Sequence, residues 1–134
     1  MRARCIFPAT AALLAFAAPA GAWTARNGNE VVAVQPPAFE VVRRHARSSA
    51  QEFWCSAGDY ATRVLGAAAT QKVYLWRPVG DSTVAPGRTA VQFTLSAPPG
   101  ADTSTGYSLT VKRAGDNLSA GFAQQYCFKS ITDF

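Results

Sequence analysis

The residues best suited to chemistry in this sequence are its three cysteines, Cys5, Cys55 and Cys127. Cys5 lies in an apolar N-terminal stretch that we interpret below as a removable export signal, which leaves one pair in the remaining chain. Redox-active pairs usually lie close together as Cys-x-x-Cys, and structural zinc sites need four ligands. In an oxidising compartment we therefore predict a disulfide between Cys55 and Cys127. The chain-entropy model gives such a bond about 4 kcal/mol of stability.

The alternative use of Cys55 is catalytic. A relay of Cys55, His45 and Asp59 can be drawn, which would make the protein a small cysteine-dependent enzyme. It requires a free Cys55 thiol. It also requires His45 to fold back onto the helix predicted at 49–66, which it precedes. The sequence contains one histidine and no phosphate-binding glycine loop, HExxH or GxSxG motif. We therefore expect no catalytic residue, cofactor or metal site, while whether the protein is an enzyme stays open.

A cluster of basic residues precedes the helix predicted at 49–66. Arg43, Arg44 and Arg47 lie close together in the sequence, beside His45. These arginines and the free amides of the helix start can together bind a carboxylate, a phosphate or a sulfated group. The competing interpretation is a solvated surface on which Glu52 offsets the positive charge locally. Arg43, Arg44 and Arg47 are thus a candidate anion-binding site.

A second candidate site is aromatic. In the predicted strand 72–77, Tyr74 and Trp76 share the face opposite Val73. If the helix covers the Val73 face, the Tyr74 and Trp76 face is left free to contact a protein or a glycan. The alternative is that the C-terminal segment, held nearby through Cys127, covers this face, because tryptophan is mostly buried in proteins.

The first residues have the composition of a cleavable secretory signal. Two arginines among the first four residues supply positive charge, and an apolar stretch follows at 5–18. Small residues at 19–22 then precede a proposed cut before Trp23. The apolar stretch is short for a membrane span, which needs about 20 residues. We therefore predict a signal peptide at 1–22, a periplasmic or secreted location and no stable membrane anchor.

Removal of that signal changes the charge of the chain. The formal net charge of the 134 residues is +5, and it falls to +3 because two arginines leave and no acidic residue does. Such a charge is ordinary for one small domain, and an exported chain meets little nucleic acid. We therefore expect no nucleic-acid partner, and we leave a protein or an anionic ligand as possible partners.

The remaining chain is expected to form one domain. Residues 23–37 contain Asn-Gly-Asn and Pro-Pro sequences and indicate a flexible lead-in, within which a short strand at 31–34 stays open. Residues 38–134 are predicted to form a single α+β domain.

The clearest predicted element is a helix at 49–66. Ser49 and Glu52 form a capping box, apolar residues recur at helical spacing, and Gly66 supplies a left-handed stop. Compact or alternating apolar runs predict strands at 39–43, 72–77, 89–95 and 107–112. This order favours an α+β fold with one main helix packed on an antiparallel meander sheet of about four strands. For 118–128 a helix and a strand are both open, with a slight preference for a short helix.

Three segments of the chain resemble small uncharacterised exported proteins of alphaproteobacteria. They are residues 53–67, which begin Phe-Trp-Cys-Ser-Ala-Gly-Asp-Tyr-Ala, residues 90–95, and the closing Tyr-Cys at 126–127. The resemblance covers most of the chain after the signal and implies a helix, a strand and a disulfide rather than an activity. The order of elements is also similar to cystatin-like folds, at the level of fold alone. The cystatin sequence Gln-Val-Val-Ala-Gly follows the helix, whereas Val-Val-Ala-Val at 31–34 precedes it and lacks the glycine.

These observations favour an exported, non-enzymatic small domain with a structural or binding role. One alternative is a protein-interaction or inhibitor module that uses the Tyr74 and Trp76 face or the loop 78–88. The other alternative is the small cysteine-dependent enzyme built around Cys55. The sequence specifies no ligand, partner or oligomeric state.

Overall fold

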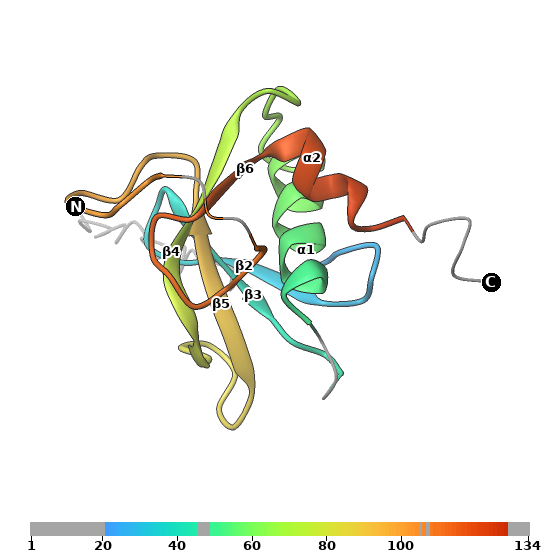
Figure 1. Cartoon of the computed structure of the whole chain (residues 1–134). Coiled ribbons are helices and arrows are strands. Elements are labelled where there is room, and N and C mark those ends of the chain that lie inside the picture. The colour runs from blue at the N-terminus through green and yellow to red at the C-terminus, as the bar shows by residue number, and fades with distance from the viewer. Residues whose placement is uncertain (1–20, 46–48, 105, 107, 129–134) are drawn as a thin grey trace, which may run out of the picture.

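The computed structural model describes residues 21–45, 49–104, 106 and 108–128. In chain order its elements are β1 (Trp23–Thr24), β2 (Glu30–Ala33), β3 (Ala38–Val42), α1 (Ala50–Arg63), β4 (Lys72–Asp81), β5 (Thr89–Thr94), β6 (Asn117–Ser119) and α2 (Ala120–Gln125). The strands pair antiparallel in one sheet, which confirms the α+β class, and Figure 1 shows α1 beside this sheet with α2 next to α1. No helix in the described part of the chain is both long and apolar enough to cross a membrane.

The strand count and the connectivity differ from the prediction. Within the described residues the sheet has six strands and the chain has two helices, rather than about four strands and one main helix. The strand order is β1-β2-β3-β5-β4-β6, so β5 inserts between β3 and β4 and the sheet is not a simple meander. β1, β2 and β6 have only two to four residues each, too few to show the alternation on which a sequence-based assignment depends.

The range 23–37, expected to be a flexible lead-in, contributes β1 and β2 to the sheet. Trp23 pairs with Val31, and Val31 pairs in turn with Val41 of β3. The Trp23 ring also meets the Tyr60 ring of α1 edge to face, with the ring centroids 5.7 Å apart. The sheet therefore begins before residue 38, and this range is part of the packed structure.

The expected strand at 107–112 is wrong for the described residues of that segment. The segment instead lies against the core, where the indole N–H of Trp54 donates to the Thr110 carbonyl oxygen at 2.9 Å. The Val79 amide of β4 donates to the Val111 carbonyl oxygen at 2.8 Å, and Val111 is buried. Its apolar alternation thus reflects burial, and β6 takes the place beside β4.

α1 is the helix that the sequence predicts. The Ser49 amide donates to the Glu52 carboxylate at 3.2 Å, as in a capping box, and the chain turns away through Gly66 at a φ of 68°. Every residue in 53–61 is buried, which one apolar face does not explain. These residues are buried because the sheet covers one side of α1 and α2 packs on another. α2 also confirms the preference for a short helix in 118–128.

The predicted disulfide between Cys55 and Cys127 is present. It joins α1 to the turn after α2 across 72 residues of sequence, and Cys55 is fully enclosed. The bond therefore holds α2 against α1, on the helical side of the molecule.

The core lies between the sheet and α1. The side chains that β3, β4 and β5 send toward α1 are large and apolar: Phe39, Val41, Val73, Leu75, Val91 and Phe93. The Trp54 ring of α1 meets the Phe93 ring at 4.9 Å between centroids. Because side chains alternate along each strand, the neighbours of these residues point to the opposite face of the sheet.

Candidate functional site

The face of the sheet turned away from α1 carries the candidate site. The side chains on this face are mostly small or polar, with two aromatic residues among them: Ala38, Glu40, Tyr74, Trp76, Gln92 and Thr94. In register, Thr94 of β5 lies between Ala38 of β3 and Tyr74 of β4. Among the described residues, loops rather than helices border this face.

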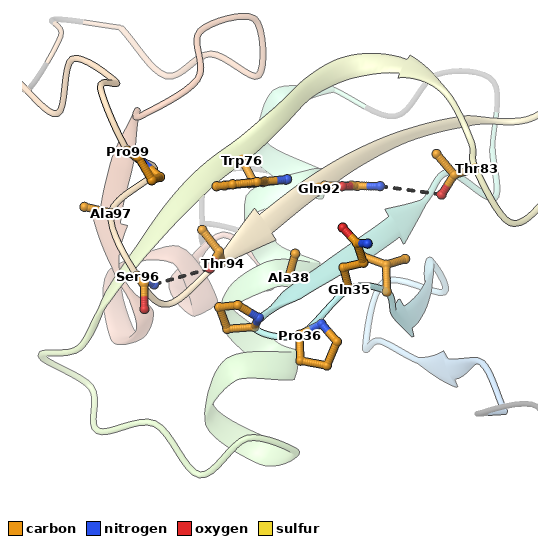
Figure 2. Close-up of a pocket in the computed structure, with 12 residues that line it drawn as sticks. Gln35, Pro36, Ala38, Trp76, Thr83, Gln92, Thr94, Ser96, Ala97 and Pro99 are labelled. Atoms are coloured by element: carbon orange, nitrogen blue, oxygen red, sulfur yellow. Dashed lines mark hydrogen bonds between the residues drawn. The ribbon is translucent and has the colours of Figure 1, made fainter.

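A groove of about 630 Å³ opens on this face, within the roughly 300–1,000 Å³ typical of small-ligand sites. Figure 2 shows Trp76 on one side of it and Gln35 with Pro36 on the other, with Ala38 and Thr94 between them. Three loops supply the rest of the lining: the turn between β2 and β3, the loop between β4 and β5, and the segment that follows β5. The groove is therefore formed by segments that are far apart in the sequence.

Trp76 owes its position to an irregularity in β4. Leu75 pairs with Phe93, but the next pairing joins Arg77 to Gln92, so Trp76 is an extra residue on its strand. A β-bulge of this kind bends the strand and redirects a side chain. Trp76 is 43% exposed, whereas tryptophan is usually well buried. The bulge thus places an indole ring at the groove.

Glu40 is buried beside the groove and is held by neutral donors. The Ser82 hydroxyl donates to one carboxylate oxygen at 2.7 Å, and the Thr83 amide and hydroxyl donate to the other at 3.0 and 2.9 Å. Burial by itself raises the pKa of the Glu40 carboxyl, but these bonds and one from Gln92 outweigh it and hold that pKa below its ordinary value. The ionised Glu40 therefore fastens the loop between β4 and β5 to the sheet.

Glu40 also fixes the orientation of the Gln92 amide. Gln92 is 8% exposed, and its side-chain nitrogen donates to Glu40 Oε1 at 3.2 Å and lies 3.5 Å from Thr83 Oγ1 (Figure 2). Because an ionised carboxylate can only accept, the nitrogen of Gln92 must face Glu40 and the oxygen must face away. That oxygen accepts no hydrogen bond from another described residue, and it is not fully enclosed. Gln92 therefore offers an acceptor at the groove.

The described lining of the groove carries no charged side chain. Its polar groups are amides and hydroxyls, of which those of Gln35, Thr83 and Ser96 belong to exposed residues, and its apolar groups come from Val34, Trp76 and the proline and alanine residues. The lining contains no acid–base pair and no histidine or cysteine. Its polar groups can therefore donate and accept hydrogen bonds without carrying a charge.

Comparisons of the chain with protein-family models, curated proteins and solved structures gave no match. The resemblances to exported alphaproteobacterial proteins and to cystatin-like folds stay predictions.

Of the predicted aromatic pair, Trp76 lines the groove and Tyr74 does not. Tyr74 is half-buried and pairs with Thr94 in the register of β4 and β5. The alternative in which the C-terminal segment covers this face is not what the described residues do, because α2 packs on α1. Whether Trp76 contacts a partner stays a prediction.

The predicted anion site falls partly outside the described residues, because Arg47 does. Arg43 is half-buried, and its carbonyl oxygen accepts from the Arg88 guanidinium at 2.7 Å. Arg44 is exposed, and its side chain lies next to Gly28 of the turn between β1 and β2. The anion site of Arg43, Arg44 and Arg47 therefore stays a prediction.

The relay drawn around Cys55 loses its nucleophile, because Cys55 is bonded to Cys127. Asp59 is fully buried and has other partners: its carboxylate accepts from the Arg26 backbone at 3.0 Å and side chain at 3.3 Å, and from Arg63 at 3.3 Å. Asp59 therefore joins the turn between β1 and β2 to α1, which is a structural role.

The other residues of the groove could not be recognised from the sequence. Gln92 and Thr94 lie on the polar side of the strand predicted at 89–95, but nothing in their spacing indicates a groove. Gln35 and Pro36 lay in the supposed lead-in. Only the pairing of β5 with β3 on one side and with β4 on the other brings these four residues to Trp76, and the sequence does not reveal that strand order.

Proposed function

We propose that this protein is an exported, non-enzymatic binding module that takes an uncharged ligand in the groove beside Trp76. The observation that carries the proposal is an exposed tryptophan on a β-bulge that lines the same groove as a well-buried glutamine whose amide oxygen has no described partner. A largely preformed, mostly apolar groove with a few placed polar groups is the usual form of a small-ligand site.

Export is supported by two independent features. The first 22 residues have the pattern of a secretory signal, and the Cys55–Cys127 disulfide is of the kind that persists in oxidising compartments. A periplasmic or secreted location is therefore part of the proposal. N-terminal sequencing of the protein recovered from the cell envelope or medium tests it, with Trp23 as the expected first residue.

The binding site itself is tested by nuclear magnetic resonance. A ¹⁵N-labelled sample is titrated with separate probes: a neutral trisaccharide, a proline-rich peptide and a sulfated trisaccharide. We expect at least one uncharged probe to shift the Trp76 indole, Gln35 side-chain and Thr94 backbone signals, which all belong to the groove. Shifts confined to other surfaces, or none with any probe, would contradict a binding role for the groove.

A second candidate function is protein interaction through the hairpin of β4 and β5. Val79 and Val84 of this hairpin are 37% and 44% exposed, and Trp76 lies on the same strand. Exposed apolar residues grouped in this way are typical of contact surfaces. Val84→Asp separates the two functions, because it should abolish a partner contact through the hairpin and leave small-ligand binding in the groove unchanged.

A further inference from the structure

We infer that the ligand of the groove is a neutral saccharide, one ring of which stacks on the indole of Trp76. This inference rests on the proposed function and goes beyond it by naming the class of ligand. It follows from the directions of the free hydrogen-bonding groups in the groove, from the absence of charge in its described lining, and from the shape of the space beside Trp76.

The first step is the acceptor that Gln92 presents. Glu40 accepts from the Gln92 nitrogen, which leaves the amide oxygen as the group available to a ligand. Gln92 is nine-tenths buried, but this oxygen is open to the groove, so a ligand that displaces water from it without supplying a donor leaves a buried acceptor unpaired, which costs free energy. The ligand must therefore carry an O–H or N–H group at this point.

The second step is the opposite wall, which offers donors as well as acceptors. Gln35 is exposed and carries both an amide N–H₂ and an amide oxygen, and the exposed Ser96 carries a hydroxyl. On the facing wall, the indole N–H of Trp76 is a further donor, and no hydrogen bond joins it to another described residue. A sugar hydroxyl donates and accepts at the same time, and a sugar ring carries several hydroxyls at fixed spacing. Mixed donors and acceptors on two walls suit such a ligand.

Two other classes of ligand, anionic groups and proline-rich peptides, fit the groove less well. An anionic saccharide or lipid headgroup calls for an arginine, a lysine or a helix N-terminus, and the described lining contains none of these. A proline-rich peptide fits an aromatic groove, but its prolines lack backbone N–H groups and so have little to give the Gln92 oxygen. A neutral saccharide needs no charged partner, and its hydroxyls can donate to the Gln92 oxygen.

The fourth step is the geometry around Trp76. The indole is exposed on a bulge, and Figure 2 shows Pro36 across the groove from it, with the small residues Ala38 and Thr94 between the two. The flat face of a pyranose ring presents C–H groups that pack on an aromatic ring, while its hydroxyls project from the edge. A ring seated on Trp76 would direct its edge toward Gln92 and Gln35.

The test uses the secreted protein with its disulfide intact. Isothermal titration calorimetry measures binding of three neutral trisaccharides, namely maltotriose, cellotriose and N,N′,N″-triacetylchitotriose, to the wild type and to variants. We expect at least one to bind, Trp76→Ala to weaken it by at least about tenfold, and Trp76→Phe to restore part of the loss. Val79→Ala, an exposed change on the same strand outside the groove, is the matched control and should bind like the wild type.

Two further variants test the polar contacts. Gln35→Ala alters an exposed turn residue that should leave folding intact, and it should weaken the same saccharide severalfold. Gln92→Leu removes the acceptor but also a donor to Glu40, so its thermal unfolding is measured in parallel. Unchanged binding in Gln35→Ala and in folded Gln92→Leu would overturn the inference.

The failures of the two proposals are distinguishable. Binding of a proline-rich peptide that depends on Trp76, with no binding of any neutral trisaccharide, overturns the saccharide and keeps the groove as a binding site. Preference for a sulfated over a neutral trisaccharide overturns the neutral ligand class in the same way. Absence of binding by all these probes overturns both the saccharide and the proposed function.

Discussion

At the scale of single residues, Glu40 connects stability and recognition. It is 1% exposed and satisfies its charge through hydroxyl and amide donors instead of a basic partner. Those donors place the loop between β4 and β5, and the bond to Gln92 sets the direction of the amide at the groove. A buried carboxylate with neutral partners is tolerated only when its hydrogen bonds are complete. Glu40 thus determines which atom of the Gln92 amide faces the groove, although Glu40 itself does not line it.

Glu40→Gln should destabilise the fold by about 1–3 kcal/mol at neutral pH, because a neutral amide brings two donors among groups that already donate. The matched control is Glu30→Gln, an exposed carboxylate paired with Arg88, for which about 0–1 kcal/mol is expected. Urea unfolding of the three proteins at pH 7 gives both values. Equal stability of the wild type and Glu40→Gln would show that the carboxylate does not fasten the loop.

The depressed pKa of Glu40 also predicts the direction of the pH dependence. Because this pKa lies below its value in the unfolded chain, the contribution is complete above the unfolded value of about 4.3 and is lost as pH falls through the folded value. The free-energy difference between wild type and Glu40→Gln should therefore shrink between pH 7 and about pH 3. A difference that stays constant over this range would contradict the assignment.

At the scale of elements, the two helices approach one another through Gly58. A Cβ atom at this position would collide with the backbone of α2, at the Gln124 nitrogen, the Ala120 oxygen and the Ala123 carbonyl carbon. Residues 56–58 of α1, Ser-Ala-Gly, all have small side chains. Small side chains are needed at these positions because α2 packs closely on α1 at Gly58. The disulfide then holds α2 in place.

Gly58→Ala separates helix propensity from packing. Alanine favours a helix by about 1 kcal/mol over glycine, yet we expect a net loss of about 1–3 kcal/mol because α2 must shift. Gly80→Ala is the control, since a Cβ there would lie 3.8 Å from its nearest neighbour, the Pro78 oxygen. Guanidinium unfolding measures both variants. A stabilised Gly58→Ala protein would mean that α2 does not pack as described.

The elements that sequence reasoning found are those whose cause is local. The Ser49–Glu52 cap, the Gly66 stop and the alternation in 72–77 and 89–95 each depend on neighbours in the chain, and each appears in the structure. Strand order depends on pairings between distant residues, and for that reason the insertion of β5 and the two N-terminal strands were missed. Trp76 was proposed as a contact residue from alternation alone, whereas the groove around it required the tertiary pairing.

At the scale of the whole molecule, the fold divides its tasks between the two faces of one sheet. On the α1 face lie the core, α2 and the disulfide, and the buried Asp59 holds the turn between β1 and β2 through Arg26. On the other face, Trp76 and Gln92 border a groove built from strands and loops. A small domain depends strongly on such added ties, because its net stability is only about 5–15 kcal/mol.

This division predicts that the disulfide can be removed without removing the groove. Replacing Cys55 and Cys127 together by alanine should lower the free energy of unfolding by about 4 kcal/mol, since the unfolded chain regains the entropy of a long loop. The signals of Gln35, Thr94 and the Trp76 indole should keep their wild-type positions in a ¹⁵N correlation spectrum, while those around α2 move. Saccharide binding measured below the unfolding transition should then match the wild type. Large shifts at the groove in a folded double variant would instead mean that the two faces are coupled, and that α2 supports the site through the sheet.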